Sequence, residues 1–120
     1  MAPEELTNAL QGAREIEIMV TGRRSGREGT RPVWFVHEGD SLYLVPVSGR
    51  ESNWYRNLLA DRAIRVRAGD TELTADAIPI DDPDRVAEVV DRFGAKYGAD
   101  KMESLYSRLD AAVEVPVTSG

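Results

Sequence analysis

The chain has 120 residues, no cysteine and a net charge of −6. The lack of cysteine excludes disulfides, thiolate metal sites and a cysteine nucleophile, and it suits the reducing cytoplasm, where we expect the protein to act. No apolar stretch is long enough for a membrane span, and the acidic net charge argues against a nucleic-acid partner. We therefore expect one soluble domain over residues 1–120 that binds a small molecule.

The chain begins with an N-terminal segment, residues 1–13, in which residues 3–12 predict a short helix. The first strand and turn follow it. Residues 15–21 alternate between apolar and polar side chains, with a period of two that is typical of a half-buried strand. Residues 22–29 read as a polar turn with three glycines. Two further strands are predicted over residues 30–39 and 41–47.

The second half of the chain alternates between helix and strand patterns. Residues 51–61 place apolar side chains four apart, which predicts a helix. After it we expect strands over 63–69 and 71–80, a helix from Pro83 to Tyr97, a second short helix over 102–109, and a strand over 111–117.

These elements define the expected fold class. Six strands with hairpin-length connections imply an antiparallel sheet, and strands in this number tend to close on themselves. The sequence therefore predicts an α+β protein, a six-stranded antiparallel split β-barrel with short helices covering its ends.

Side-chain catalysis has little support in the sequence. His37 is the only histidine, so neither a catalytic triad nor a histidine-based metal site is favoured. We expect no metal and no catalytic side chain.

Two polar segments instead suggest an anion-binding site. Residues 21–34 combine glycines with four arginines, and arginine pairs well with phosphate. Residues 48–58 form a Ser-Gly turn leading into a helix, whose free N–H groups attract anions. The alternatives are a flexible hairpin with solvated arginines and an ordinary helix cap above a core-facing Trp-Tyr pair.

The sequence resembles the deazaflavin-dependent nitroreductase family, within the split-barrel flavin and deazaflavin oxidoreductases. The resemblance covers residues 14–117 and depends on three pieces, 21–35, 40–49 and 53–75. The most specific is the Trp-Tyr-x-Asn-Leu signature, with Trp54, Tyr55, Asn57 and Leu58 at its defined positions.

The resemblance implies coenzyme F420 as cofactor and assigns residues to its parts. The phosphate tail would contact Arg23, Arg24 and Ser25, and the ring would lie along Arg31, Pro32, Val33 and Trp34. Its other edge would meet Val47, Ser48 and Gly49, while the ribityl chain and phosphate would meet Asn53, Trp54 and Asn57. Arg50 would take the place of a lysine that the family carries in this loop.

The implied activity is transfer of hydride from reduced F420 to an organic acceptor, a quinone, nitroaromatic or enone. Tyr43 or Tyr106 would lie beside the substrate and supply a proton. The alternatives are an FMN-binding oxidoreductase or flavin-binding module, and a cofactor-free barrel that binds another ligand. We also expect a homodimer, because Val33, Phe35 and Leu44 are assigned to an apolar outer face.

Overall fold

The computed structural model describes residues 10, 13–106 and 109–117. Within these residues, eight antiparallel strands form two four-stranded sheets, with strand orders β2-β1-β5-β6 and β3-β4-β8-β7. The strands are β1 (Ile16–Thr21), β2 (Glu28–Val33), β3 (Val36–Glu38), β4 (Ser41–Leu44), β5 (Ala63–Ala68), β6 (Thr71–Asp76), β7 (Ile78–Ile80) and β8 (Ala112–Pro116). The helices are the 3₁₀ turn η1 (Gly49–Glu51), α2 (Asn53–Ala60), α3 (Pro83–Tyr97) and α4 (Ala99–Leu105).

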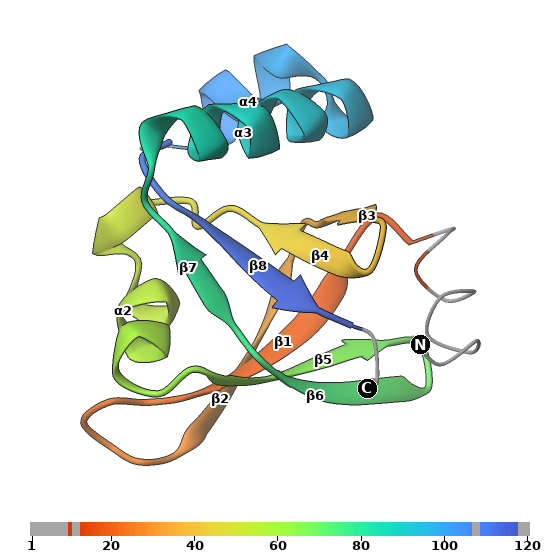
Figure 1. Cartoon of the computed structure of the whole chain (residues 1–120). Coiled ribbons are helices and arrows are strands. Elements are labelled where there is room, and N and C mark those ends of the chain that lie inside the picture. The colour runs from red at the N-terminus through yellow and green to blue at the C-terminus, as the bar shows by residue number, and fades with distance from the viewer. Residues whose placement is uncertain (1–9, 11–12, 107–108, 118–120) are drawn as a thin grey trace.

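These elements are stacked in layers (Figure 1). The sheet with β1 at its centre lies below the sheet with β4 and β8 at its centre, and α3 and α4 cover the far side of that second sheet. Helix α2 lies at one side, beside β7 and β1. The α+β class and the antiparallel pairing are confirmed.

The apolar side chains form two clusters that correspond to the layers. One cluster fills the space between the two sheets and includes the fully buried Ile18, Phe35 and Val66. The other lies between the second sheet and the helical layer, where Val89 and Phe93 of α3 are buried. Alternation along the strands therefore points one face of the second sheet to each cluster.

The expected number of six strands is wrong, because two predicted strands each bend and continue in the other sheet. The stretch 30–39 is divided at Trp34 and Phe35 into β2 and β3, and the stretch 71–80 is divided at Ala77 into β6 and β7. At the bends, backbone N–H groups form hydrogen bonds outside the regular pairing of the strands. The Phe35 N–H donates to the Tyr97 hydroxyl, at 3.1 Å, and the Ala77 N–H donates to the Arg62 carbonyl, at 2.7 Å.

The other predicted elements have close counterparts. The helix expected over 51–61 is η1 followed by α2, and the strand expected over 41–47 ends at Leu44, just before the Val45-Pro46 pair. The second short helix ends at Leu105. The short helix expected within residues 1–13 falls almost wholly outside the described residues.

The apolar outer face expected for a dimer is wrong. Phe35 and Leu44 are both 0% exposed and belong to the core between the sheets, and Val33 is half-buried against the same core. The described residues contain no helix that could cross a membrane.

Candidate functional site

A cavity of about 510 Å³ opens between the two sheets, α2 and the end of α4. Four separate stretches of the chain form its walls: the start of β1, the end of β2, the loop from β4 into α2, and the end of α4. The lining residues are Glu15, Arg31, Pro32, Val33, Trp34, Val45, Val47, Ser48, Glu51, Ser52, Asn53, Trp54, Leu105 and Tyr106. A cavity of this size holds a ligand the size of a cofactor ring system.

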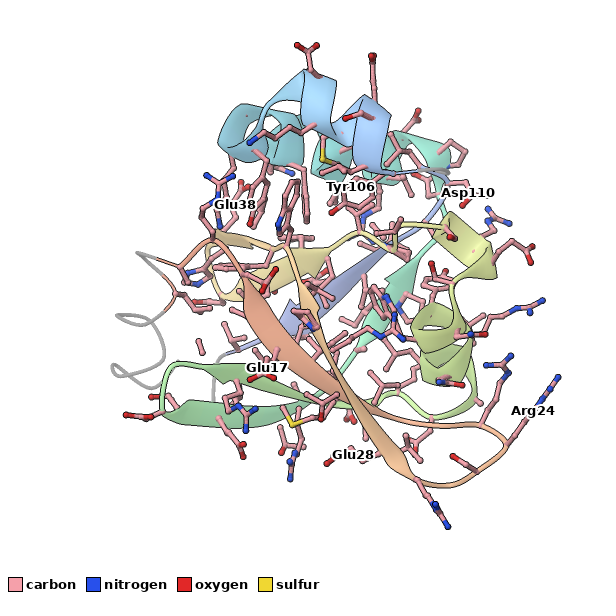
Figure 2. The ribbon with its side chains drawn as sticks, turned by 180° about the vertical axis from the view of Figure 1, so that it is seen from behind. Glu17, Arg24, Glu28, Glu38, Tyr106 and Asp110 are labelled. Atoms are coloured by element: carbon pink, nitrogen blue, oxygen red, sulfur yellow. The ribbon has the colours of Figure 1, made fainter. Side chains whose placement is uncertain are left out.

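One wall of the cavity is aromatic. The indole of Trp34 stacks on the ring of Tyr97, with centroids 4.2 Å apart and planes 9° apart. Tyr106 approaches the same indole at 6.2 Å and a tilt of 52°. Tyr106 lies between the helical layer and the second sheet (Figure 2), so this wall presents flat apolar surface to a ligand.

Another part of the cavity lining is the N-terminus of α2. Its N-cap residue, Ser52, makes no side-chain cap within the described residues, because the Ser52 hydroxyl accepts a hydrogen bond from the Ser48 N–H at 2.9 Å. The first turn of α2, with Asn53 and Trp54, therefore faces the cavity without a capping side chain. Arg31 of β2 lines the same cavity and adds a positive charge. A helix N-terminus beside a guanidinium suits a phosphate group.

Two carboxylates, Glu15 and Glu51, also line the cavity. Glu51 lies 3.7 Å from the Arg56 guanidinium, so part of its charge is balanced on the helix surface. The cavity lining thus combines aromatic rings, a helix N-terminus with Arg31, and two carboxylates. This set fits a planar ring that carries a phosphate on a side chain.

The structure places nine predicted site residues on this cavity. They are Arg31, Pro32, Val33, Trp34, Val47, Ser48, Asn53, Trp54 and Tyr106.

Arg23 and Asn57 do not line the cavity but contact each other beside it. The Asn57 side-chain oxygen accepts hydrogen bonds from the Arg23 N–H at 3.1 Å and from its guanidinium at 2.7 Å. The same guanidinium reaches the Asn53 carbonyl at 3.4 Å. These bonds fasten the β1–β2 hairpin to α2.

Other predicted residues lie at the hairpin tip and in η1. Arg24 projects outward from the tip (Figure 2). The Ser25 hydroxyl accepts a hydrogen bond from the Arg27 N–H at 3.1 Å and lies only 2.6 Å from where a Cβ on Gly22 would be, which explains the glycine. Gly49 has a φ of 56°, a conformation that favours glycine, and is buried in η1.

Arg50 lies apart from the large cavity. Its N–H donates to the Asp110 carboxylate at 2.9 Å, and its guanidinium donates to the Asp81 carbonyl at 3.3 Å. It lines a second cavity of about 380 Å³ against α3, with Asp81, Asp110 and the apolar side of α3. Its contacts join η1 to the segments before α3 and β8.

Tyr43 also lies outside the large cavity. It sits on β4, opposite Glu114 of β8 and Val36 of β3, and packs with the cluster beneath the helices. Burial and the charge of Glu114 raise the pKa of its hydroxyl.

Tyr106 is the tyrosine that lines the cavity. Its side chain is 8% exposed, and burial, followed by the neighbouring Tyr97, raises its pKa to about 12. The Tyr106 hydroxyl therefore stays protonated at neutral pH and can donate a hydrogen bond to an acceptor oxygen.

Five lining residues had not been predicted. Glu51, Ser52 and Leu105 each adjoin a predicted residue, Glu15 begins a predicted strand, and Val45 lies within one. The position of Ser52 before α2 was the available signal, since serine is a preferred N-cap. Leu105 was available only through its neighbour Tyr106, since its own position in the helix pattern indicates a core residue.

The fold and the cavity define a split-barrel-like protein with room for a cofactor-sized ligand. The family model of the F420H(2)-dependent quinone reductases matches residues 3–117, so this chain belongs to that family and uses coenzyme F420 as its cofactor. The resemblance noted in the sequence is confirmed. No match to a protein of curated function was found.

Solved structures share the fold. An F420-H2 dependent reductase, FDR-A, is 21% identical with a TM-score of 0.67, and the match covers 85% of this chain and 93% of that one. HutZ, a heme storage protein from Vibrio cholerae, is 14% identical with a TM-score of 0.72 and matches 100% of this chain and 93% of its own. A structure described as a domain-swapped dimer is 21% identical with a TM-score of 0.67, covering 92% and 94%.

Proposed function

We propose that this chain uses reduced F420 to reduce an apolar quinone in the 510 Å³ cavity. The observation that carries the proposal is the pairing of a flat aromatic wall at Trp34 with an uncapped helix N-terminus and Arg31 across one cavity. When bound, the reduced cofactor supplies a hydride. The residues of this chain bind and orient the two reactants and exclude water.

The anchoring residues divide by chemistry. Arg31, Asn53 and the first turn of α2 hold the phosphate, while Trp34, Pro32 and the Val47–Ser48 loop flank the ring. Arg23 and Asn57 support this arrangement by holding the hairpin against α2. Arg24 and Ser25 lie at the hairpin tip, from which Arg24 can reach the anionic tail beyond the cavity.

The acceptor site is at the apolar rim. Val47 and Leu105 line the cavity, yet their side chains are 49% and 54% exposed. Exposed apolar side chains at a cavity mouth favour an apolar acceptor ring. Tyr106 donates a hydrogen bond to the acceptor oxygen, and solvent supplies the proton that completes the hydroquinone.

Titration and turnover test this function together. F420 and FMN are titrated side by side, and then reoxidation of F420H₂ is followed with a simple quinone, a nitroaromatic and an enone. We expect binding of F420 in preference to FMN, and turnover fastest with the quinone. Preferential FMN binding would contradict the cofactor site, and quinone turnover no faster than that of the others would contradict the acceptor assignment.

We also propose a homodimer in the cytoplasm. The similar structure described as a domain-swapped dimer supports self-association, and the absence of cysteine suits a reducing compartment.

A further inference from the structure

We propose that Tyr97 is a positioning residue, which holds Trp34 and the backbone on both sides of the aromatic wall in the place that the cofactor needs. Tyr97 is the last residue of α3 and is 5% exposed. It is not among the residues that line the cavity. This inference rests on the proposed function, because it concerns the same cavity.

The ring of Tyr97 supports the indole directly. The two rings are nearly parallel, 4.2 Å apart, and Trp34 lies between Tyr97 and the cavity that it lines. The Tyr97 ring has two further neighbours. Its centroid lies 5.8 Å from that of the Phe93 ring and 5.5 Å from the guanidinium carbon of Arg14. Tyr97 is therefore held within α3 and the segment before β1, and it limits the orientations open to Trp34.

The hydroxyl of Tyr97 holds the backbone at two places. It accepts a hydrogen bond from the Phe35 N–H at 3.1 Å and lies 2.7 Å from the Arg14 carbonyl, to which it donates. Arg14 and Phe35 are the chain neighbours of Glu15 and Trp34, two lining residues that lie just before β1 and in the bend between β2 and β3. One hydroxyl thus joins these two segments at this end of the cavity.

The remaining polar group at the bend has a partner of its own. The Phe35 carbonyl accepts a hydrogen bond from the Lys96 ammonium at 2.9 Å, and that ammonium lies 3.6 Å from the centre of the Phe35 ring. The Tyr97 hydroxyl lies 2.7 Å from the Arg14 carbonyl and 2.9 Å from the Phe35 carbonyl, and we assign its one proton to the shorter contact. Within the described residues, no other side chain is seen to bond both the segment before β1 and the bend.

The test compares Tyr97→Leu, Tyr97→Phe and Trp34→Leu by titration with F420. Loss of the stacked ring should weaken F420 binding by about three- to tenfold, the equivalent of one aromatic pair. Tyr97→Phe keeps the ring but loses the hydrogen bonds of the hydroxyl to Phe35 and Arg14, so its F420 affinity should lie between those of the wild type and Tyr97→Leu. In the double variant with Trp34→Leu, the change at Tyr97 should have little further effect, because the partner ring is already gone.

Val89→Ala is the matched control for lost stability. Val89 is buried in the same helix and the same cluster but has no ring to stack on Trp34 and no side-chain hydroxyl to bond the backbone at Arg14 and Phe35. It should unfold more easily than the wild type while binding F420 with unchanged affinity. If Val89→Ala weakened F420 binding as much as Tyr97→Leu does, the proposal would be overturned. The same holds if the losses of F420 affinity in Trp34→Leu and Tyr97→Leu simply added in the double variant.

A measurement without cofactor separates this proposal from the proposed function. Trp54 is 5% exposed and Trp34 is half-buried, so acrylamide quenches chiefly the emission of Trp34. Quenching should increase in Tyr97→Leu and stay at the wild-type level in Val89→Ala. Failure of the wild type to bind F420 would contradict the function alone, whereas unchanged quenching in Tyr97→Leu would overturn the positioning role.

Discussion

At the scale of single residues, Trp54 packs in the core between the sheets with 5% of its surface exposed, and part of it also lines the cavity. Trp54→Ala should lower the free energy of unfolding by about 3–5 kcal/mol, because a large buried side chain is removed. Urea denaturation measures this loss. A loss below about 1 kcal/mol, the range of ordinary surface changes, would show that the indole is not a core residue.

Trp54→Phe serves as the companion variant, since it keeps much of the bulk but removes the indole N–H. If it binds F420 like the wild type, Trp54 contributes to the cavity by shape alone.

The cavity arginine and the arginine outside it should behave differently. Arg31→Ala removes a guanidinium beside the phosphate position, so F420 binding should weaken by about 1.5–3 kcal/mol, the range for hydrogen bonds to charged groups. Arg50→Ala should instead lower stability and leave F420 affinity nearly unchanged, because Arg50 binds Asp110 and Asp81. Isothermal titration gives both affinities. The exposed Arg62 supplies an Arg→Ala control for net charge, and equal losses at all three positions would contradict the site.

The sequence indicated the types of residue at the site better than their individual contacts. Glycines, arginines and a helix start are local patterns, so Arg31, Trp34 and residues 53–54 could be predicted to face a ligand, whereas Pro32 and Val33 were implied by the family resemblance. Arg50 and Tyr43 differ because their direction depends on partners far along the chain, Asp110 and Glu114. No local pattern contains that information.

At the scale of elements, the β1–β2 hairpin depends on α2 through Arg23 and Asn57. Asn57→Ala removes the oxygen that accepts both hydrogen bonds from Arg23, so the hairpin should open more readily. The loss of about 1 kcal/mol predicts roughly fivefold faster hydrogen exchange at the Arg23 amide.

Asn57→Asp keeps an acceptor opposite the Arg23 guanidinium and should retain slow exchange at that amide. Equal exchange in both variants would mean that Asn57 does not hold the hairpin.

The elements themselves were largely predictable, apart from the strand bends. Alternation with a period of two identified the strands over 15–21 and 63–69. The run from Val33 to Val36 is wholly apolar, and neither Trp34–Phe35 nor Ala77 is a proline or glycine that would mark a break. The bends arise because buried side chains at those points face different clusters on either side. The position of each bend depends on how the two sheets and the helical layer pack together, and sequence periodicity does not contain that information.

At the scale of the whole molecule, buried tyrosines should limit stability in alkali. The pKa of Tyr106 is raised from 10.0 to about 12 in the folded state, so the unfolded chain loses this proton first. Stability should therefore be unaffected below about pH 10 and fall by about 2–3 kcal/mol as the pH rises towards 12. Urea unfolding across this range measures the fall.

Tyr106→Phe should lose less stability than the wild type over the same alkaline range. Burial also raises the pKa of Tyr55 and Tyr97, so some alkaline loss should remain in this variant. Identical pH profiles for the two proteins would contradict the shift at Tyr106.

Self-association is the remaining prediction at this scale. Light scattering at micromolar concentration should give twice the 13.3 kDa chain mass. A monomer mass at every concentration would contradict the proposed homodimer. Phe35 and Leu44 are fully buried within one chain, so an interface between two intact protomers would use other residues.

The bend at Trp34–Phe35 restricts how related chains can differ in length. Along four successive positions, Val33 packs on the core between the sheets, Trp34 turns to the helical layer, Phe35 returns to the first core, and Val36 packs on the second cluster. One inserted residue here would reverse the face of every side chain that follows in β3. Insertions at the tip of the β1–β2 hairpin disturb no such alternation. Natural length variation should therefore collect at the tip, while the spacing between β2 and β3 stays constant.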